Sequence, residues 1–179
     1  TNYDTVPAEI DHISDWAKSN NLKLNASKTK EMIIYRTAEL KKKLTNLPPP
    51  IPGIQRVAQM KILGVIMDDK LSFHLHAEKI LSASAGKIYA IKSIKNNGLT
   101  GNALWDVTNA TLVSQMLYAS PVWWGFLDEM NKSRLLAILK KLSKTGLLSP
   151  SYQPFDILCE QADDNLFCSA LNNKNHVLH

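Results

Sequence analysis

Two pairs of adjacent aspartates are the residues of this chain best suited to holding a metal ion. Asp68-Asp69 follows a short apolar stretch, and Asp163-Asp164 lies in an acidic segment near the C-terminus. Carboxylate oxygens are the ligands that Mg²⁺ and Ca²⁺ prefer, but several must converge on one ion. No third carboxylate is spaced to join either pair. We therefore predict capping or solvent-facing side chains, and no metal site.

The cysteines and histidines fit no metal or nucleophile pattern either. Cys159 and Cys168 are nine residues apart, which places them on nearly opposite sides of a helix, so they cannot easily form a disulfide. Both are predicted to be buried, reduced thiols of an intracellular protein. The histidines show no metal-ligand spacing, and neither a glycine-rich phosphate loop nor a catalytic triad is evident.

A cluster of cations is the strongest physical sign of a binding partner. Arg134, Lys140, Lys141 and Lys144 fall on one arc of a predicted amphipathic helix, where they could follow a phosphate backbone. The net charge is +5 overall but −3 in residues 149–179, which leaves +8 for residues 1–148. A basic body of this kind favours a polyanionic partner. The alternative is a merely solvated helix face.

The first third of the chain predicts one helix followed by short strands. Val6, Ile10, Ile13 and Ala17 recur at helical spacing, and Asn20-Asn21 should end that helix. Strands are predicted over residues 31–36, 55–57 and 60–67. Between them, a loop is predicted from Lys41–Lys43 through the prolines at 48–50 and 52, since no helix or central strand tolerates such a run.

The remaining chain predicts helices. A long helix should run from Leu71 to about Asn96 and end at Asn97-Gly98. Residues 102–119 carry apolar side chains all round the helical wheel, which predicts a buried helix. Next come an amphipathic helix over 132–144 and a last helix over 155–171. The last helix should face inward through Phe155, Leu158, Ala162 and Leu166. The uncharged run 107–127 contains too many polar residues and a proline to suit lipid, so no membrane span is predicted.

Four blocks of the sequence resemble one protein family. Trp16–Met32 (WAKSNNLKLNASKTKEM) resembles motif D of non-LTR (LINE-type) retrotransposon reverse transcriptases. Lys61–Phe73 (KILGVIMDDKLSF), followed by His76, resembles their motif E, the primer-grip hairpin. Leu117–Phe126 (LYASPVWWGF) is similar to their thumb signature, and Ala162–Leu178 is similar to the segment after the thumb. The blocks occur in the family's order and cover nearly the whole chain.

The resemblance implies an α+β fold with three parts. Residues 1–69 would be a small, antiparallel remnant of the polymerase palm, residues 70–148 an α-helical thumb bundle, and residues 149–179 a linker with a C-terminal helical tail. We expect the thumb to fold and residues 1–60 to be looser. Trp123 and Trp124, in the thumb signature, could stack on bases, but a proline-framed Trp pair between helices is more often core.

The resemblance also implies roles for single residues. Lys28 matches the motif D lysine, whose ammonium could protonate or neutralise the leaving pyrophosphate. Lys61, Gly64 and Val65 match the primer grip, where a glycine permits close approach of the backbone to the primer. The family's two Mg²⁺ ions are held by an Asp of an early palm strand and by an aromatic-x-Asp-Asp hairpin. Neither Asp pair of this chain has that context, so we expect no catalytic residue and no cofactor here.

The expected function is therefore that of a fragment of an RNA-directed DNA polymerase. It would hold an RNA/DNA primer–template in the cytoplasm or nucleus, together with the missing N-terminal part of the enzyme, and would not polymerise alone. Two alternatives stay open. The chain could be a decayed genomic copy without a selected function, or it could be a helical interaction module. Residues 20–65 also resemble a domain attributed to the N-terminus of an AlkB-like oxygenase, but the chain has no His-x-Asp for the iron site of such an oxidoreductase.

Overall fold

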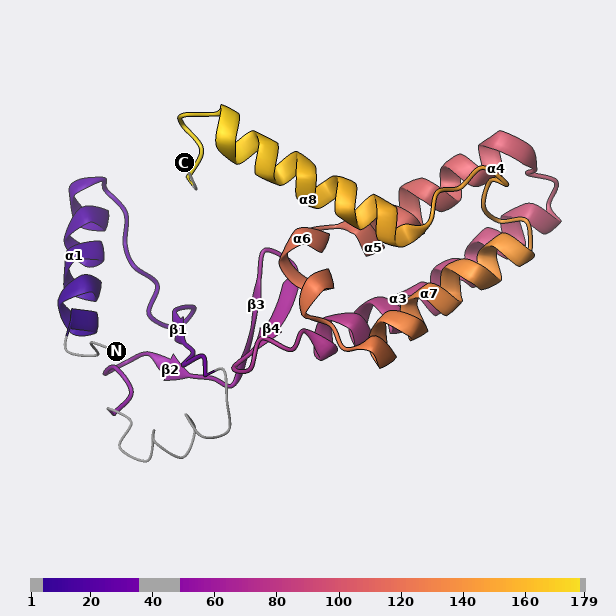
Figure 1. Cartoon of the computed structure of the whole chain (residues 1–179). Helices are drawn as coiled ribbons and strands as arrows, with labels where there is room; N and C mark the ends of the chain where they lie inside the picture. The colour runs from indigo at the N-terminus through magenta and orange to yellow at the C-terminus, as the bar shows by residue number, and fades with distance from the viewer. Residues whose placement is uncertain (1–4, 36–48, 178–179) are drawn as a thin grey trace. The chain divides into compact units, whose positions relative to one another are not determined.

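A computed structural model describes residues 5–35 and 49–177, and these divide into two compact units. Unit 1 is Thr1–Leu71 and unit 2 is Ser72–His179. Figure 1 labels the elements of both. Short strands occur in unit 1 and helices dominate unit 2, so the predicted α+β class is confirmed.

Unit 1 contains one helix and two separate two-stranded sheets. Its elements are α1 (Val6–Ser19), β1 (Lys30–Glu31), β2 (Gln55–Arg56), β3 (Gln59–Ile62) and β4 (Val65–Asp68). The pair β3–β4 is antiparallel, as expected, but β1 pairs with β2 in parallel. The ion pair between Arg56 and Glu31, with nitrogen and oxygen 2.9 Å apart, joins the side chains of that parallel pair.

Two strand predictions for unit 1 were wrong in extent. Only Lys30–Glu31 forms a strand where residues 31–36 were predicted, and Arg36 lies outside the described residues. Residues 60–67 are not one strand but most of the β3–β4 hairpin, in which Ile62 pairs with Val65. The predicted loop from Lys41 to Pro48 also lies outside the described residues, whereas Pro49–Gly53 is irregular, as predicted.

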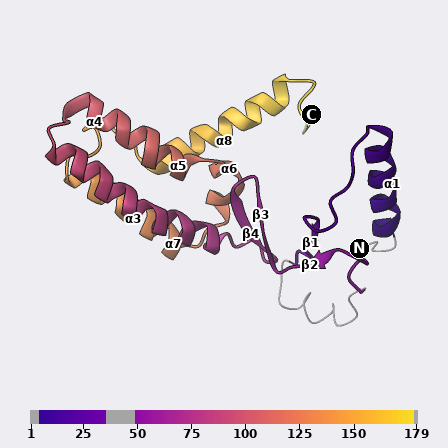
Figure 2. The ribbon, with the colours of Figure 1, turned by 180° about the vertical axis from the view of Figure 1, so that it is seen from behind.

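Unit 2 is a helical bundle. Its elements are α3 (His74–Asn96), α4 (Gly101–Thr108), the π-helical turn η3 (Asn109–Val113), α5 (Ser114–Leu117), α6 (Ser120–Trp123), the 3₁₀ turn η4 (Trp124–Phe126), α7 (Glu129–Lys144) and α8 (Phe155–Asn172). The helix α3 packs against α4, η3 and α7, and the view from behind in Figure 2 shows α3 and α7 side by side. Leu104, Leu112, Met116, Leu135 and Leu142 are fully buried between them.

Three helices end in the same way, and the sequence explains why. Asn21, Gly98 and Gly146 follow α1, α3 and α7 with φ of 56°, 100° and 66°. This left-handed conformation suits glycine and asparagine. The next amide then donates back across the last turn, as from Leu22 to the Ala17 carbonyl at 2.8 Å and from Leu147 to the Leu142 carbonyl at 2.9 Å. These hydrogen bonds satisfy carbonyls that the helix end would leave without a partner.

The segment predicted as one helix buried on every side, residues 102–119, differs from the prediction. It is helical in α4, η3 and α5, but only one side is buried, through Leu104, Thr108, Leu112, Val113 and Met116. The π turn lets this buried side continue past Leu112 and Val113. Lys87 of α3 donates to the Thr111 carbonyl at 2.7 Å and to Gln115 Oε1 at 2.6 Å, so a lysine stabilises the turn from the neighbouring helix.

Candidate nucleic-acid interface

The helix α7 presents opposite faces to the bundle core and to solvent. Asp128 caps its N-terminus, since the Asn131 amide donates to Asp128 Oδ1 at 2.7 Å. Leu135, Leu139 and Leu142 are buried against the bundle. Lys140, Lys141 and Lys144 are exposed, as the amphipathic pattern predicted. We call these three residues the α7 lysine cluster.

The α7 lysine cluster carries positive charge that no acidic side chain offsets within the described residues, because none lies in ion-pair distance of it. Two of the lysines stand in the last turn of α7, where cations also interact favourably with the helix dipole. This interaction stabilises the helix but does not occupy the N–H donors of the lysine ammonium groups. Among the described residues, the three ammonium groups therefore have no acidic side chain as a partner.

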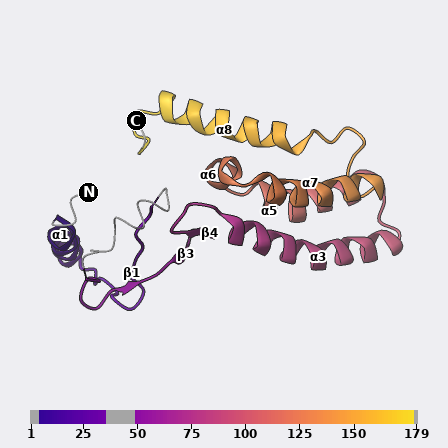
Figure 3. The ribbon, with the colours of Figure 1, turned by 60° about the horizontal axis from the view of Figure 1, so that its bottom comes forward.

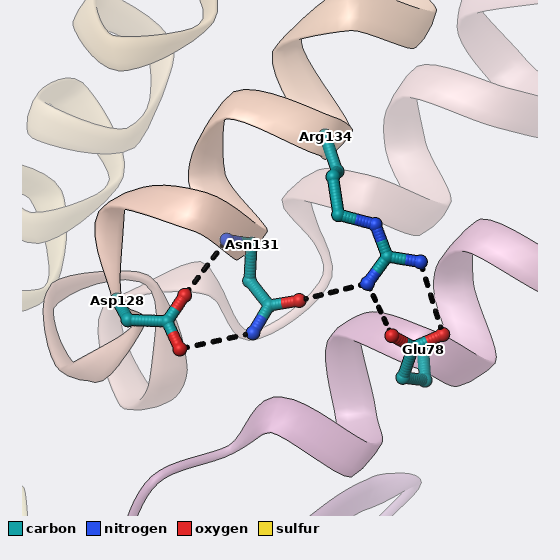
Figure 4. A network of polar contacts seen from close by, with 4 residues as sticks. All are labelled: Glu78, Asp128, Asn131 and Arg134. Carbon is teal, nitrogen blue, oxygen red and sulfur yellow. Dashed lines mark hydrogen bonds and ion pairs between the residues drawn. The ribbon is translucent and has the colours of Figure 1, made fainter.

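Arg134, predicted to belong with these lysines, makes different contacts. Its guanidinium forms a forked ion pair with Glu78 of α3, in which Nη2 donates to Oε2 at 3.3 Å and Nη1 donates to Oε1. Nη1 also donates to Asn131 Oδ1 at 3.2 Å, and the Asn131 side chain in turn donates to Asp128 (Figure 4). The hydrogen bond from Arg134 lowers the pKa of Glu78, and the same bond raises the pKa of Arg134. Arg134 thus joins α7 to α3, and Glu78 offsets its charge.

Lys95 of α3 also serves the bundle. Its ammonium donates to the carbonyl of Thr145, the residue that ends α7, at 2.6 Å. Together with Lys87 on the π turn, it shows that lysines in the apolar arc of α3 bind backbone carbonyls of neighbouring helices. These two lysines of α3 are therefore engaged within the bundle and belong to no basic stripe.

The predicted primer-grip residues lie on the β3–β4 hairpin of unit 1. Lys61 is exposed on β3, and Val65 is buried at the start of β4. The two-residue turn between the strands is Leu63-Gly64, with φ of 46° and 95°. Positive φ at both positions is typical of a type I′ turn, whose twist matches that of a hairpin. Leu63 adopts a left-handed backbone conformation that is unfavourable for a residue with a Cβ atom. Its side chain is 86% exposed.

Lys28, the motif D candidate, is exposed in a turn that ends just before β1. Asn25 organises this turn, because its Oδ1 accepts hydrogen bonds from Ser27 Oγ at 2.7 Å and from the Lys28 amide at 3.2 Å. Lys28 and the hairpin residues belong to unit 1, whereas the α7 lysine cluster belongs to unit 2. The predicted site residues therefore form separate groups, each on its own unit.

The Trp pair belongs to the core of unit 2. Trp123 is fully buried and Trp124 is 9% exposed. Successive edge-on ring contacts run from His76 to Trp123 at 5.1 Å, to Trp124 at 5.8 Å and to Phe155 at 5.1 Å. The Trp123 indole N–H donates to the Tyr118 carbonyl at 3.0 Å. Base stacking by these rings is excluded in this conformation, in line with the prediction that they are core.

The aspartate pairs take structural roles where their contacts are known. Asp68 is buried, and its Oδ1 accepts from the Lys70 amide at 3.1 Å, so it caps a turn rather than facing solvent. Asp69 Oδ2 accepts from the Tyr35 hydroxyl at 2.9 Å. Asp163 and Asp164 are exposed on α8. Among residues 5–35 and 49–177, no group of three or more His, Cys, Asp or Glu side chains could hold a metal ion.

The prediction that both cysteines are buried is wrong for one of them. Cys159 is 2% exposed, and burial raises the pKa of its thiol to about 12. Cys168 is exposed. The prediction that Leu166 faces inward is also wrong, since its side chain is 42% exposed. Both errors have one cause: α8 continues beyond the helices it packs on, and periodicity does not reveal where a neighbouring helix ends.

Sequence reasoning missed Glu78, the residue that offsets the charge of Arg134. The two residues are 56 positions apart, so no local spacing signals their pairing. Only the packing of α3 against α7 brings them together.

Comparisons with known proteins add no relative. No family model matches the chain, and neither a curated protein nor a solved structure matches it significantly. Within the described part of the chain, none of the helices has the length and apolar character that crossing a bilayer requires.

Proposed function

We propose that this chain binds the phosphate backbone of a nucleic acid through the α7 lysine cluster, as the thumb of a non-LTR reverse transcriptase fragment. The observation that carries the proposal is the cluster itself: three exposed lysines on one helix face without an ion-pair partner among the described residues. The four family-like sequence blocks supply the choice of primer–template as the ligand. Such a fragment would act inside the cell, in the cytoplasm or nucleus.

The spacing of the lysines suits a phosphate backbone. Lys140 and Lys144 are one helical turn apart, a rise of about 6 Å, and Lys141 lies beside them. Phosphates of one strand recur about every 3.4 Å along a duplex axis, so the cluster could engage neighbouring phosphates. Lysine contacts of this kind read charge and backbone position rather than base sequence. We therefore expect binding without strong sequence preference.

The proposal assigns no catalytic step to this chain. In the parent polymerase, Mg²⁺ would be held by aspartates of palm motifs that no segment of this sequence resembles. Lys28 would neutralise the leaving pyrophosphate there, and Lys61, Gly64 and Val65 would hold the primer strand near its 3′ end. These roles need the remaining part of the polymerase as a partner.

Binding of a fluorescently labelled RNA/DNA primer–template by the full chain tests the proposal. The test variant carries Lys140→Glu, Lys141→Glu and Lys144→Glu. A control with the same charge change carries Lys23→Glu, Lys70→Glu and Lys174→Glu, all exposed and outside the proposed contacts. We expect the test variant to lose at least about tenfold in affinity at low salt, since three phosphate contacts are removed, and the control to lose much less.

Two results would contradict the proposal. Equal losses in both variants would mean that only net charge matters and that the α7 lysine cluster is not a site. No binding at low salt by a chain whose circular dichroism shows folded helices would favour the alternative, a relic without biochemical function.

A further inference from the structure

The last helix, α8, packs on the bundle with only its first half. Phe155 and Cys159 are 2% exposed, and the Phe155 ring contacts Trp124 edge-on at 5.1 Å. From Asp163 to Asn172 no side chain is buried, although the helix stays regular. Figures 1 and 3 both show this half extending past the other helices of unit 2. Helical segments this short are marginal in water without packing, so a covering partner would stabilise this one.

One side of α8 combines negative charge with large apolar side chains. Asp156, Glu160, Asp164, Phe167 and Leu171 follow one another at spacings of three or four residues, which places them along one line on the helix. We call this line the α8 stripe. Its N-terminal part carries carboxylates, and its C-terminal part carries Phe167 and Leu171, which are 64% and 57% exposed.

The charge of the α8 stripe is not compensated locally. The helix contains four acidic residues and neither lysine nor arginine. None of these carboxylates forms an ion pair with a basic side chain among the described residues. A partner that fits this surface therefore carries cations opposite the carboxylates and apolar side chains opposite Phe167 and Leu171.

We propose that the α8 stripe docks a basic amphipathic helix, with cations against Glu160 and Asp164 and large apolar side chains against Phe167 and Leu171. A second copy of this chain fits less well. Its α7 lysine cluster would complement the carboxylates, but among the exposed residues of that face (Met130, Ser133, Arg134 and Ala137) only Met130 is large and apolar, and one such side chain does not cover both Phe167 and Leu171. The docking surface is distinct from the α7 lysine cluster and does not depend on nucleic-acid binding.

The test uses the full chain and two labelled synthetic peptides in fluorescence anisotropy titrations. One peptide is an amphipathic helix of leucine and lysine, and the other replaces each lysine by glutamate. The apolar variant carries Phe167→Ser and Leu171→Ser, and the charge-reversed variant carries Glu160→Lys and Asp164→Lys. Tyr89→Ser, on a 78% exposed side chain of α3, is the matched control. All these side chains are exposed, and circular dichroism verifies that each variant keeps its helices.

We expect the leucine–lysine peptide to bind the natural chain and the Tyr89→Ser control equally. The apolar variant should lose at least about tenfold in affinity, as for a residue at the centre of an interface. The charge-reversed variant should prefer the leucine–glutamate peptide. Binding that is unchanged in the apolar variant would overturn the proposal. So would light scattering that shows a dimer for the natural chain and a monomer for the apolar variant, because a second copy would then occupy the stripe.

Discussion

The two cysteines of α8 lie in contrasting surroundings that predict very different reactivity. Cys159 is 2% exposed, and burial raises the pKa of its thiol from 9.0 to about 12, with Asp156, Asp163 and Glu160 acting in the same direction. Cys168 is exposed on the half of α8 that extends beyond the bundle. Alkylation rates therefore report directly on where α8 is packed.

The expected magnitude follows from the fraction of thiolate, which is the reactive form. At a pH of about 8, a thiol with its ordinary pKa of 9.0 is about one-tenth ionised, whereas a thiol with a pKa of about 12 is about one ten-thousandth ionised. The folded protein should therefore slow alkylation of Cys159 by about a thousandfold relative to the unfolded chain, before any steric protection is added.

Maleimide labelling at several times, with peptide mapping by mass spectrometry, measures both rates in the natural chain. The Cys168→Ser variant isolates Cys159, and labelling in guanidinium chloride supplies its unfolded rate. Cys168 should be modified early in the folded protein and Cys159 only on opening of the helix. A folded rate for Cys159 within about tenfold of its unfolded rate would refute the packing of α8 against the aromatic core.

Three further predictions concern the bundle. Burial, with a smaller effect of Lys79, lowers the pKa of His76, so folding favours its neutral form and the stability of the fold should fall as the pH drops below about 6.5. Thermal unfolding measured from about pH 7.5 to 5.5 should show this loss of stability. A His76→Phe variant that loses as much stability would rule His76 out as the source. Leu142→Ala removes a side chain that is 1% exposed and should lower the free energy of unfolding, measured in urea, by about 2–5 kcal/mol. Met130→Ala, at a 65% exposed position, is the control. An equal loss of stability in the two variants would mean that α7 is not packed as described. Glu78→Gln removes the anion beside Arg134 and should tighten binding of the primer–template in anisotropy titrations, while weaker binding would show that α7 needs this ion pair to hold its position.

Helix ends were predictable from the sequence because local chemistry determines them. Asn20-Asn21 and Asn97-Gly98 were expected to end helices, and Asn21 and Gly98 do adopt the left-handed conformation that ends α1 and α3. The exposure of the α7 lysine cluster was predictable for the same reason, since the amphipathic pattern of α7 assigns each residue to a face.

Strand pairing was less predictable because it depends on partners distant in sequence. Lys30–Glu31 pairs in parallel with Gln55–Arg56, and nothing in either segment indicates this direction. The Leu63-Gly64 turn was missed because leucine rarely adopts positive φ, so an apolar run with one glycine looked like a continuous strand.

Which residues of different helices contact one another could not be predicted from the sequence in two places. Arg134 looked like a fourth free cation of α7, because its partner Glu78 is supplied by α3. Leu166 and Cys168 looked buried, because the apolar periodicity of α8 continues where its neighbours end. In both cases the decisive information is where a neighbouring helix lies, which the local sequence does not contain.

The dependence of affinity on salt tests the central claim, phosphate binding by the α7 lysine cluster, most directly. The logarithm of the association constant for the primer–template would be measured against the logarithm of salt concentration for the natural chain and for the variant with Lys140→Glu, Lys141→Glu and Lys144→Glu. Three lost phosphate contacts should make the slope shallower by about 2.7. Parallel lines for the two proteins would show that these lysines release no counterions on binding and would contradict the account.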